Sequence, residues 1–551
     1  MIPVAATTLA FLLAAAFMPR ASEKLFGAVE RAFGQLSRHR LRGMAALFFG
    51  VIVARLALLP LLPVPTPGIH DEFSYLLMED TFAHGRLANP THPMWMSFET
   101  FHVNWFPTYS SMYPPAQGAV LALGQVLGSP WIGVLLSAAA MCAAIYWMLC
   151  AWMPSRWAFG GGALAALKLG LASYWMNSYW GGAVATIGGA LVFGALARLF
   201  KRVSLRDALI LGIGVSILAN SRPYEGLVFC APAAFLLLRR LWQEAKSKGA
   251  ASIPWGSVLA PLGAVLALTL CFMGYYNWRL TGNATLFPYQ VNLRTYNSAP
   301  MFVWQPWQTE KHYNNDRFEE FYNVWEREEY PRSWKGLLTV SHTKTTRLAS
   351  AFLWWGSLLA LPGLPFALLD RKYLALWVTL FCVLIAIYIV AWSNAHYAAP
   401  ATCLVFALIV QSLRHLRTMG TKRFAWGKAL ARAAVLVLVV DTAMAASDGK
   451  CDPLFWTCTG DKSRTLVIEK LRAEPGKHLV IVRYNEDDLS VHDEWVYNSA
   501  DIDNSKIVWA RELDKTQNEK LFAYFKDRKV WLATTQDGHL VFGPYEEPKD
   551  K

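Results

Sequence analysis

Long runs of apolar residues, separated by short polar or basic stretches, fill most of the chain up to residue 445. Runs such as 43–62, 131–153, 253–275 and 373–393 are close to the roughly 20 residues that a helix needs to cross a bilayer. A soluble enzyme, a disordered tail protein or a small disulfide scaffold would not contain them. The pattern predicts an all-α polytopic membrane protein with about 12 transmembrane helices.

Basic residues gather in alternate loops between these apolar runs. The net charge is +13 over 551 residues, but residues 446–551 are net acidic, so the excess lies in the apolar part. Lys and Arg in short loops mark the cytoplasmic side of a membrane protein. We therefore interpret the charge as a topology signal and not as a nucleic-acid footprint. The first apolar run, 2–18, precedes its basic segment, which is the reverse of a secretory signal, and we expect an uncleaved helix.

The pattern divides the chain into two parts. Residues 1–445 form the membrane domain, with two long outer loops at 63–115 and 276–345. In residues 446–551, short apolar runs alternate with helical patterns, which is typical of a soluble α/β unit. This unit follows the last predicted span, so we expect it on the outer side. Its strands are expected at 478–483, 506–509, 530–533 and 539–542, and its helices at 462–473 and 514–526. Cys451 and Cys458 open this part, either as a disulfide loop or as two free thiols.

The first outer loop carries two adjacent carboxylates, Asp71 and Glu72, directly after a proline-rich exit from the membrane. Such a pair can divide a task, because one carboxylate accepts a proton while its neighbour orients a partner. The alternative is a solvated turn that happens to contain both acids.

Other polar groups are predicted on the same side of the membrane. Arg222 matches the geometry of a phosphate, or it forms a local salt bridge with Glu225. His396 and Tyr397 either contact a ligand or hydrogen-bond a helix end. Trp and Tyr residues on this side, including the 174–180 stretch, are also what an interfacial aromatic belt contains.

An Asp-Glu pair in the first outer loop, ahead of a Tyr-Pro-Pro element and many helices, resembles the GT-C glycosyltransferases. The group that it resembles most contains protein O-mannosyltransferases and lipid A aminoarabinose transferases, which is glycosyltransferase family 39 with its bacterial relatives. The resemblance covers residues 43–413 and depends on Asp71-Glu72, Tyr75, Tyr113-Pro114-Pro115 and the 394–400 stretch. It implies a GT-C type of membrane domain.

The resemblance also implies a reaction, the transfer of a sugar from a polyprenyl-phosphate donor to a lipid, glycan or protein acceptor at the outer face of the bacterial inner membrane. Asp71 is then the general base, and Glu72 positions Asp71 or the acceptor. The residues expected to bind substrate are His70, Tyr75, His92, Tyr113, Asn177, Tyr179, Arg222, Glu225, His396 and Tyr397. Two departures leave the sugar open, because the 174–180 loop lacks an acid and His396 replaces the Arg of many relatives.

Two further classes of function remain as alternatives. A transporter or flippase for lipid-linked saccharides would show internal repeats and charges in the middle of helices, and the candidates for such charges are Arg55 and Lys168 alone. A non-catalytic envelope assembly protein would use the C-terminal unit to bind a partner. The sequence contains no HExxH, paired CxxC or DxD ligand run, so no cofactor is assigned and a divalent metal has no motif to support it.

Overall fold

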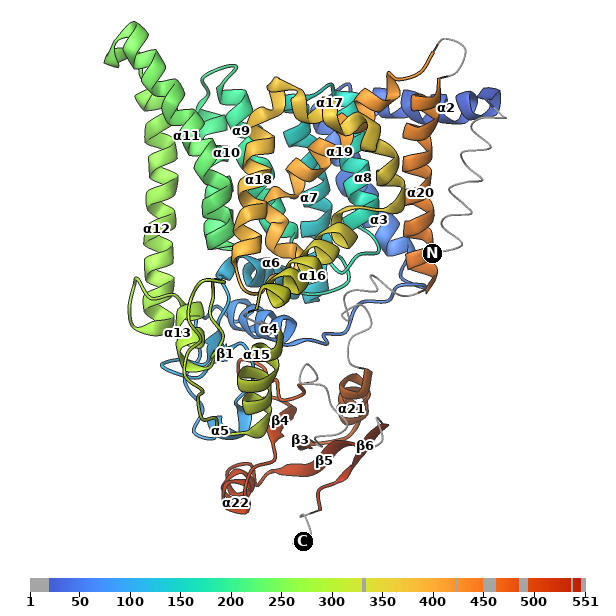
Figure 1. The fold of residues 1–551 in the computed structure, drawn as a ribbon. Helices are drawn as coiled ribbons and strands as arrows, with labels where there is room; N and C mark the ends of the chain where they lie inside the picture. The colour runs from blue at the N-terminus through green and yellow to red at the C-terminus, as the bar shows by residue number, and fades with distance from the viewer. Residues whose placement is uncertain are drawn as a thin grey trace.

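A helical bundle and a small sheet-containing unit lie at opposite ends of the molecule, with a layer of loops and short helices between them (Figure 1). The computed structural model describes residues 19–329, 333–421, 425–448, 462–484, 494–536 and 539–546. The fold is mostly helical, contains several apolar helices and ends in a small sheet domain, as the sequence predicts. The run at 2–18, Cys451 and Cys458 lie outside the described residues.

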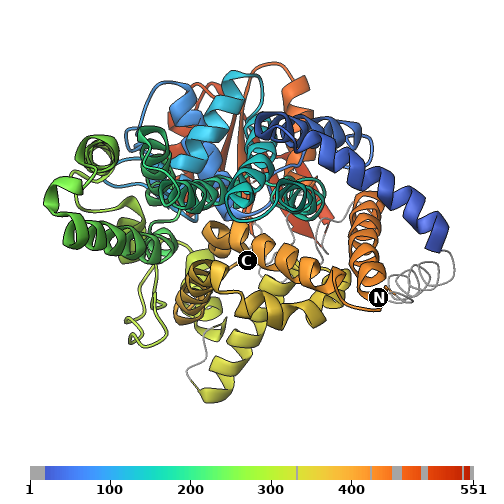
Figure 2. The same ribbon diagram turned by 90° about the horizontal axis from the view of Figure 1, so that it is seen from above.

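The bundle is formed by helices that run between its two ends (Figures 1 and 2). They are α3 (Arg40–Ala57), α7 (Pro130–Trp152), α8 (Ser155–Leu169), α9 (Ala183–Leu199), α10 (Leu205–Ala219), α11 (Pro223–Lys248), η2 with α12 (Trp255–Leu259, Ala260–Thr281), η4 with α17 (Trp355–Gly363, Leu364–Leu369), α18 (Leu374–Ile389), η6 with α19 (Ala395–Ala401, Thr402–Arg417) and α20 (Trp426–Asp448). Helix α16 (Trp334–Phe352) lies obliquely at the end of the bundle next to the layer of loops. Helix α2 (Pro19–Leu36) lies across the end of the bundle that is farthest from the sheet unit.

The number of membrane spans is given by length and composition for part of the bundle only. Among the described residues, five helical segments are long and apolar enough to cross a membrane, or six if a bent pair is one span. The count of about 12 is therefore not confirmed. The bent pair is α16 with η4 and α17, which meet at 93°. The break lies at Leu353 and Trp354, which have extended backbone, and Trp354 donates its indole N–H to the carbonyl of Ala434, at 2.8 Å, on helix α20.

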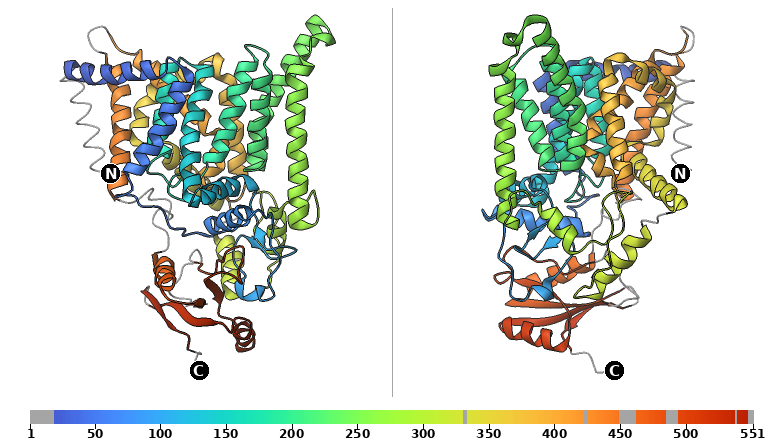
Figure 3. Two further views of the ribbon diagram at one scale, coloured as in Figure 1. Left: turned by 180° about the vertical axis from the view of Figure 1, so that it is seen from behind. Right: turned by 60° about the vertical axis from the view of Figure 1, so that its left-hand side comes forward.

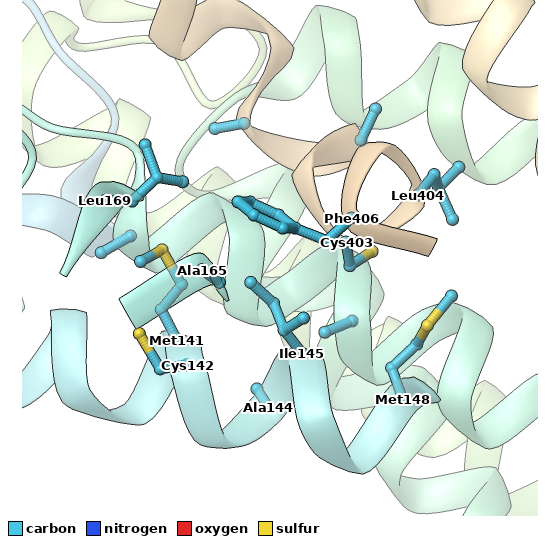
Figure 4. Close-up of a cluster of buried hydrophobic side chains, with 14 of the residues drawn as sticks. Met141, Cys142, Ala144, Ile145, Met148, Ala165, Leu169, Cys403, Leu404 and Phe406 are labelled. Atoms are coloured by element: carbon cyan, nitrogen blue, oxygen red, sulfur yellow. The ribbon is translucent and has the colours of Figure 1, made fainter. Parts of the chain in front are cut away.

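Helix α7 lies at the centre of the bundle, where α3, α8, α9 and α19 surround it. Figure 4 shows its side chains facing those of α8 and α19, with Met141, Cys142, Ile145 and Met148 opposite Leu169, Cys403 and Phe406. Alanines fill the space between these larger groups. Small residues allow helix backbones to approach closely, which is how helices associate where water gives no driving force.

Glycines on α9 bring it into close contact with its neighbours. A Cβ atom at Gly189 would lie 2.0 Å from the carbonyl oxygen of Pro400, and one at Gly188 would lie 3.0 Å from the carbonyl oxygen of Gly214. These glycines therefore serve helix packing. They do not form part of the cavity described below.

The two outer loops fold together into the middle layer. The first contains α4 (His70–Ala83), α5 (Trp95–Phe98), α6 (Pro115–Val126) and an antiparallel pair, β1 (Val103–Asn104) and β2 (Ser110–Ser111). The second contains α13 (Pro288–Thr295), α14 (Asp316–Phe318), η3 (Glu319–Trp325) and α15 (Glu326–Glu329). Phe101 of the first loop packs on Phe318 and Phe321 of the second, with ring centroids 4.6 and 4.7 Å apart.

The sheet unit has the element order that the sequence predicts. Its elements are α21 (Lys462–Ala473), β3 (Lys477–Arg483), β4 (Ile507–Arg511), α22 (Lys515–Tyr524), β5 (Arg528–Gln536) and β6 (His539–Pro544). The strand order is β4-β3-β5-β6, with β3 parallel to β4 and β5, and β6 antiparallel to β5. Helix α20 ends at Asp448, slightly beyond the boundary expected at 445.

The sheet unit packs directly on α4 (Figure 3). The ring of Tyr497 stacks on Phe73 with centroids 4.2 Å apart. The backbone N–H of Ala500 donates to Asp80 at 2.7 Å, and the Tyr109 hydroxyl donates to the carbonyl of Asn498 at 3.1 Å. The helix that begins at the predicted acidic pair is thus held between the bundle and the sheet unit.

Candidate active site

A buried arginine fastens the proline-rich exit from α3. The Arg55 guanidinium donates to the carbonyl of Leu62 at 2.8 Å, to that of Pro63 at 3.2 Å and to the side-chain oxygen of Asn177 at 2.8 Å. Proline lacks an N–H and keeps this segment out of helix, so its carbonyls need side-chain donors. Lys168 likewise donates to a carbonyl, that of Ser350, at 2.7 Å. Both side chains that could have been intramembrane charges therefore have hydrogen-bond acceptors within the protein.

The exit segment leads into α4, where Glu72 closes the turn. Its carboxylate accepts backbone hydrogen bonds from Gly68 at 2.8 Å, Ile69 at 3.3 Å and Tyr179 at 3.0 Å. Full burial raises the pKa of Glu72 to about 7, although these donors act in the opposite direction. Glu72 therefore joins the start of α4 to the 174–180 loop and points away from the cavity beside Asp71.

Asp71 opens into a cavity of about 410 Å³ at the junction of the bundle and the middle layer. The cavity walls come from the start of α4, the segment before α6, the α10–α11 turn, α13, the end of η3 and the 390–397 stretch. Seven of the predicted residues line it, namely His70, Asp71, Tyr75, Tyr113, Arg222, Glu225 and Tyr397. Segments more than 300 residues apart in the sequence thus meet around one space.

Asp71 is held by a tyrosine of the Tyr-Pro-Pro element. The Tyr113 hydroxyl donates a hydrogen bond to the Asp71 carboxylate, and its ring stacks on Tyr75 with centroids 4.5 Å apart. Burial raises the pKa of Tyr113 well above its ordinary value, which keeps the phenol a donor. Ser74 and Ser111 share a hydrogen bond of 2.7 Å that holds α4 against β2.

Arg222 supplies the positive charge of the cavity. It is the residue before α11, and its guanidinium carbon lies 4.3 Å from the centre of the Tyr397 ring. No ion pair within 4.0 Å joins Arg222 to a carboxylate of the residues that the structure describes. The local salt bridge with Glu225, which was the alternative explanation for this residue, does not form at that distance. The half-buried guanidinium faces the same space as Asp71.

Four predicted residues have other places. Asn177 accepts from Arg55, and Tyr179 donates its hydroxyl to the carbonyl of Pro65 at 3.0 Å, so both hold the exit segment. His396 is buried behind the cavity wall, where the centroid of its ring lies 4.5 Å from that of Trp180. His92 lies at the sheet unit, 3.1 Å from the Asp503 carboxylate. None of these side chains lines the cavity.

The cavity also contains polar residues that the sequence did not single out: His102, Tyr289, Gln290, Glu326 and Asn394. The Glu326 carboxylate accepts from the Asn297 amide at 2.9 Å, and burial raises its pKa to about 8. His102 has φ 61°, which is uncommon for a residue with a side chain, and burial lowers its pKa. Of these five residues, only Asn394 could have been expected from the sequence, because it is the first residue of the 394–400 motif.

Metal ligands are not grouped in the described part of the chain, where no cluster of three His, Cys, Asp or Glu side chains has a geometry that could hold a metal ion. The cavity polar groups are instead a mixture of carboxyl, phenol, amide and guanidinium groups. This set can accept a proton, bind hydroxyl groups and neutralise one negative charge.

Comparison with known proteins gives similarity in structure only. No protein-family model matches the chain, and no curated protein matches it in sequence. The structure of ArnT from Cupriavidus metallidurans bound to undecaprenyl phosphate matches 90% of this chain and 93% of that chain, with 12% identity and a TM-score of 0.48. The apo state of the same protein matches 91% and 94%, with 10% identity and a TM-score of 0.47.

A second protein gives a similar match. The Archaeoglobus fulgidus oligosaccharyltransferase, in a crystal structure with a tethered acceptor peptide, matches 89% of this chain and 69% of that chain, with 11% identity and a TM-score of 0.46. Both proteins are glycosyltransferases of the GT-C class, which is the class that the sequence resembles. At such identities and TM-scores the likeness concerns the fold, and function has to be inferred from the cavity itself.

Proposed function

We propose that this protein is an integral membrane glycosyltransferase that moves a sugar from a polyprenyl-phosphate donor to an acceptor hydroxyl. One observation carries the proposal: Asp71, oriented by Tyr113, and Arg222, without a carboxylate partner within 4.0 Å among the described residues, face one cavity at the edge of an apolar bundle. A base and a cation in one space suit a reaction in which a proton and a phosphate leave from opposite sides.

The reaction is a single displacement. The acceptor oxygen bonds to the anomeric carbon while the bond from that carbon to the phosphate oxygen breaks, which inverts the configuration. Asp71 takes the acceptor proton as general base. Arg222 neutralises the charge that develops on the departing phosphate, which is the kind of electrostatic stabilisation that contributes most in a water-poor site. The aromatic walls, Tyr75 and Tyr397 among them, offer faces for the sugar ring.

Glu72 has a supporting role in this proposal. Its three backbone hydrogen bonds hold the first turn of α4, so it positions Asp71 and does not contact the substrate. Glu225 and Glu326, which both line the cavity, are proposed to bind hydroxyl groups of the sugar or acceptor.

The proposed orientation has the cavity and the sheet unit on the outer side of the bacterial inner membrane. It is supported by the basic residues at the other end of the bundle, which include Arg202, Arg206, Lys372 and Arg414 at helix ends. Lys and Arg favour the cytoplasmic side. The polyprenyl tail then lies in the outer leaflet and the acceptor approaches from the periplasm.

The experiment compares wild type with Asp71→Asn in purified, full-length protein. Release of polyprenyl phosphate is measured for a panel of prenyl-phosphate-linked sugars. We expect wild type to turn over one donor, and Asp71→Asn to lose about 100- to 10,000-fold in rate, the typical contribution of a general base. Asp71→Glu restores part of that rate because it keeps a carboxylate at the site.

The matched control is Asp527→Asn, which makes the same change at an exposed position of the sheet unit and should retain the wild-type rate. A folded wild-type protein that binds a donor but never releases polyprenyl phosphate from it contradicts the proposal. In that case the transporter or assembly function gains support, and Asp71 becomes a binding residue.

A further inference from the structure

A second polar pocket lies at the end of the bundle opposite Asp71. Its volume is about 520 Å³, and five cations line it: Arg40, Arg198, Lys201, Arg202 and Arg206. Asp207 is the single acid among its described lining residues. No carboxylate of the described residues lies within 4.0 Å of any of the five, in contrast to Arg417 and Arg432 of the same end, which pair with Glu30 and Glu23.

The inner part of this pocket is rigid. The Arg198 guanidinium donates to the carbonyls of Gly194 and Trp147 at 2.6 and 2.7 Å, and it lies 3.8 Å from the centre of the Trp147 ring. Lys201 donates to the carbonyl of Ala151 at 2.8 Å. Arg40, Lys201, Arg202 and Arg206 are exposed, and Arg198 is half-buried. Arg198 and Lys201 are thus held by backbone carbonyls, and the other three cations stand at the exposed rim.

An apolar groove of about 420 Å³ continues from this pocket into the bundle. Trp147 and Arg206 line both spaces, so the two share a wall. The rest of the groove is apolar, with Met44, Phe48, Ala140, Leu191 and Ile210 among its lining residues. It follows α3, α7, α9 and α10, which pack on each other in that order and stand together in the rear view (Figure 3).

We propose that these two spaces form one binding site for an anionic phospholipid of the adjacent leaflet. The phosphate of the lipid lies among the five cations, and one acyl chain lies in the groove from Met44 to Ala140. Basic pockets between transmembrane helices are suited to acidic lipid headgroups, because each Lys or Arg near the surface adds to the attraction. A soluble phosphate would use the basic pocket but not the groove.

The site is separate from the proposed reaction. The cavity around Asp71 is lined by the outer loops, the α10–α11 turn with the start of α11, and the 390–397 stretch, and no residue lines both sites. A lipid bound here holds the ends of α3, α9 and α10 together, since their cations would contact the same phosphate.

The experiment is a titration of detergent-purified, full-length protein, followed by native mass spectrometry. The probes are dioleoylphosphatidylglycerol, dioleoylphosphatidylcholine and sn-glycerol 3-phosphate. We expect one phosphatidylglycerol to bind at least tenfold more tightly than phosphatidylcholine, and more tightly than glycerol 3-phosphate. Arg202→Gln with Arg206→Gln should weaken the acidic lipid by about tenfold or more, because two rim charges are lost.

The matched control is Arg239→Gln with Lys248→Gln, which removes two exposed charges from α11, outside both spaces, and should keep the wild-type affinity. Ala140→Phe tests the groove without touching a charge, and should weaken phosphatidylglycerol while leaving glycerol 3-phosphate unchanged. Size-exclusion chromatography checks that each variant is folded.

Three results overturn the proposal. Equal losses of phosphatidylglycerol affinity in the rim and control variants would show that the lipid is attracted by the overall charge of this end of the protein. Equal affinity for glycerol 3-phosphate and phosphatidylglycerol would show a site for a free phosphate ester. Full phosphatidylglycerol affinity in a folded Ala140→Phe protein would remove the acyl chain from the groove.

Discussion

Tyr113 is the one side chain that holds Asp71 by a hydrogen bond among the described residues, and it also forms a wall of the cavity. Tyr113→Phe keeps the stack on Tyr75 but removes the donor. We expect kcat to fall about tenfold and the KM for the donor to change little, since one hydrogen bond contributes about 0.5–1.5 kcal/mol. Steady-state kinetics with the prenyl-linked donor measures both constants.

Tyr275→Phe is the control for Tyr113→Phe, because Tyr275 lies half-exposed on α12, away from the cavity. A Tyr113→Phe protein with wild-type kcat would show that Asp71 does not depend on this bond for its orientation.

Glu79 gives the stability of the protein a pH dependence. It is 4% exposed, and its Oε1 has no hydrogen-bond partner among the residues that the structure describes. Burial raises its pKa from 4.5 to about 8. The folded protein therefore keeps a proton that the unfolded chain releases above pH 4.5, so the free energy of unfolding falls as the pH rises between those two values.

Glu79→Gln removes this titration. We expect the loss of Tm between pH 5 and pH 8 to be smaller in the variant than in wild type, as thermal unfolding in detergent would show. Glu519→Gln, at an exposed position of α22, should behave like wild type. An unchanged pH dependence in Glu79→Gln would mean that Glu79 ionises in the folded protein.

Residues in short motifs or in short turns on the predicted outer side were the predictable part of the cavity. Asp71 and Tyr75 lie on one short helix, and the prolines beside Tyr113 marked a boundary. Tyr289 and Glu326 carried no such signal, because they come from the long second loop, whose fold against the first loop is set by tertiary packing around Phe101. His396 was expected in the cavity because it precedes Tyr397 in the sequence. Adjacent residues of the short helix point in different directions, so the His396 side chain packs on Trp180 behind the cavity wall.

At the scale of the helix, two glycines should respond in opposite ways to the same substitution. Gly189→Ala would place a Cβ 2.0 Å from the backbone of Pro400, and we expect a cost of about 1–3 kcal/mol from the overpacking. Gly160 lies inside α8 with no atom within 4 Å of the added Cβ, so Gly160→Ala should stabilise by about 0.5–1 kcal/mol.

The measurement for this pair is the fraction of monodisperse protein that remains after heating in detergent. A lower midpoint for Gly189→Ala and an unchanged or higher one for Gly160→Ala is the expected result. Equal midpoints would mean that α9 can move away from η6 at no cost.

Apolar length and basic loops were enough to locate most helices, because a span must bury a nearly continuous run of side chains. The run at 131–153, for example, matches α7 to within one residue at each end. The break between α16 and η4 could not be predicted, since no proline marks it and the Trp354 beside it bonds a helix 80 residues away. Helix α4 was also missed, because its polar start reads as a loop.

At the scale of the molecule, the sheet unit supports the helix that carries Asp71. Tyr497→Ala removes the ring that stacks on Phe73, two residues from Asp71. We expect turnover to fall several-fold and the sheet unit to become more sensitive to limited proteolysis. The two effects should appear together, because the same ring contact supports both α4 and the sheet unit.

Leu466→Ala, at an exposed position of α21 in the same unit, is the comparison and should leave turnover and proteolysis unchanged. Full turnover in Tyr497→Ala, with the sheet unit readily cleaved, would show that α4 is oriented by the bundle alone.

The size of the cavity limits which part of a lipid-linked donor the protein can recognise. About 410 Å³ is at the small end of the range for ligand sites, enough for a sugar with its phosphate but not for a long isoprenoid. The tail has to remain in the lipid. The protein would then discriminate donors by headgroup and not by the number of isoprene units. Shortening the tail would change how much donor partitions into the bilayer, and the rate of a bound molecule would stay the same.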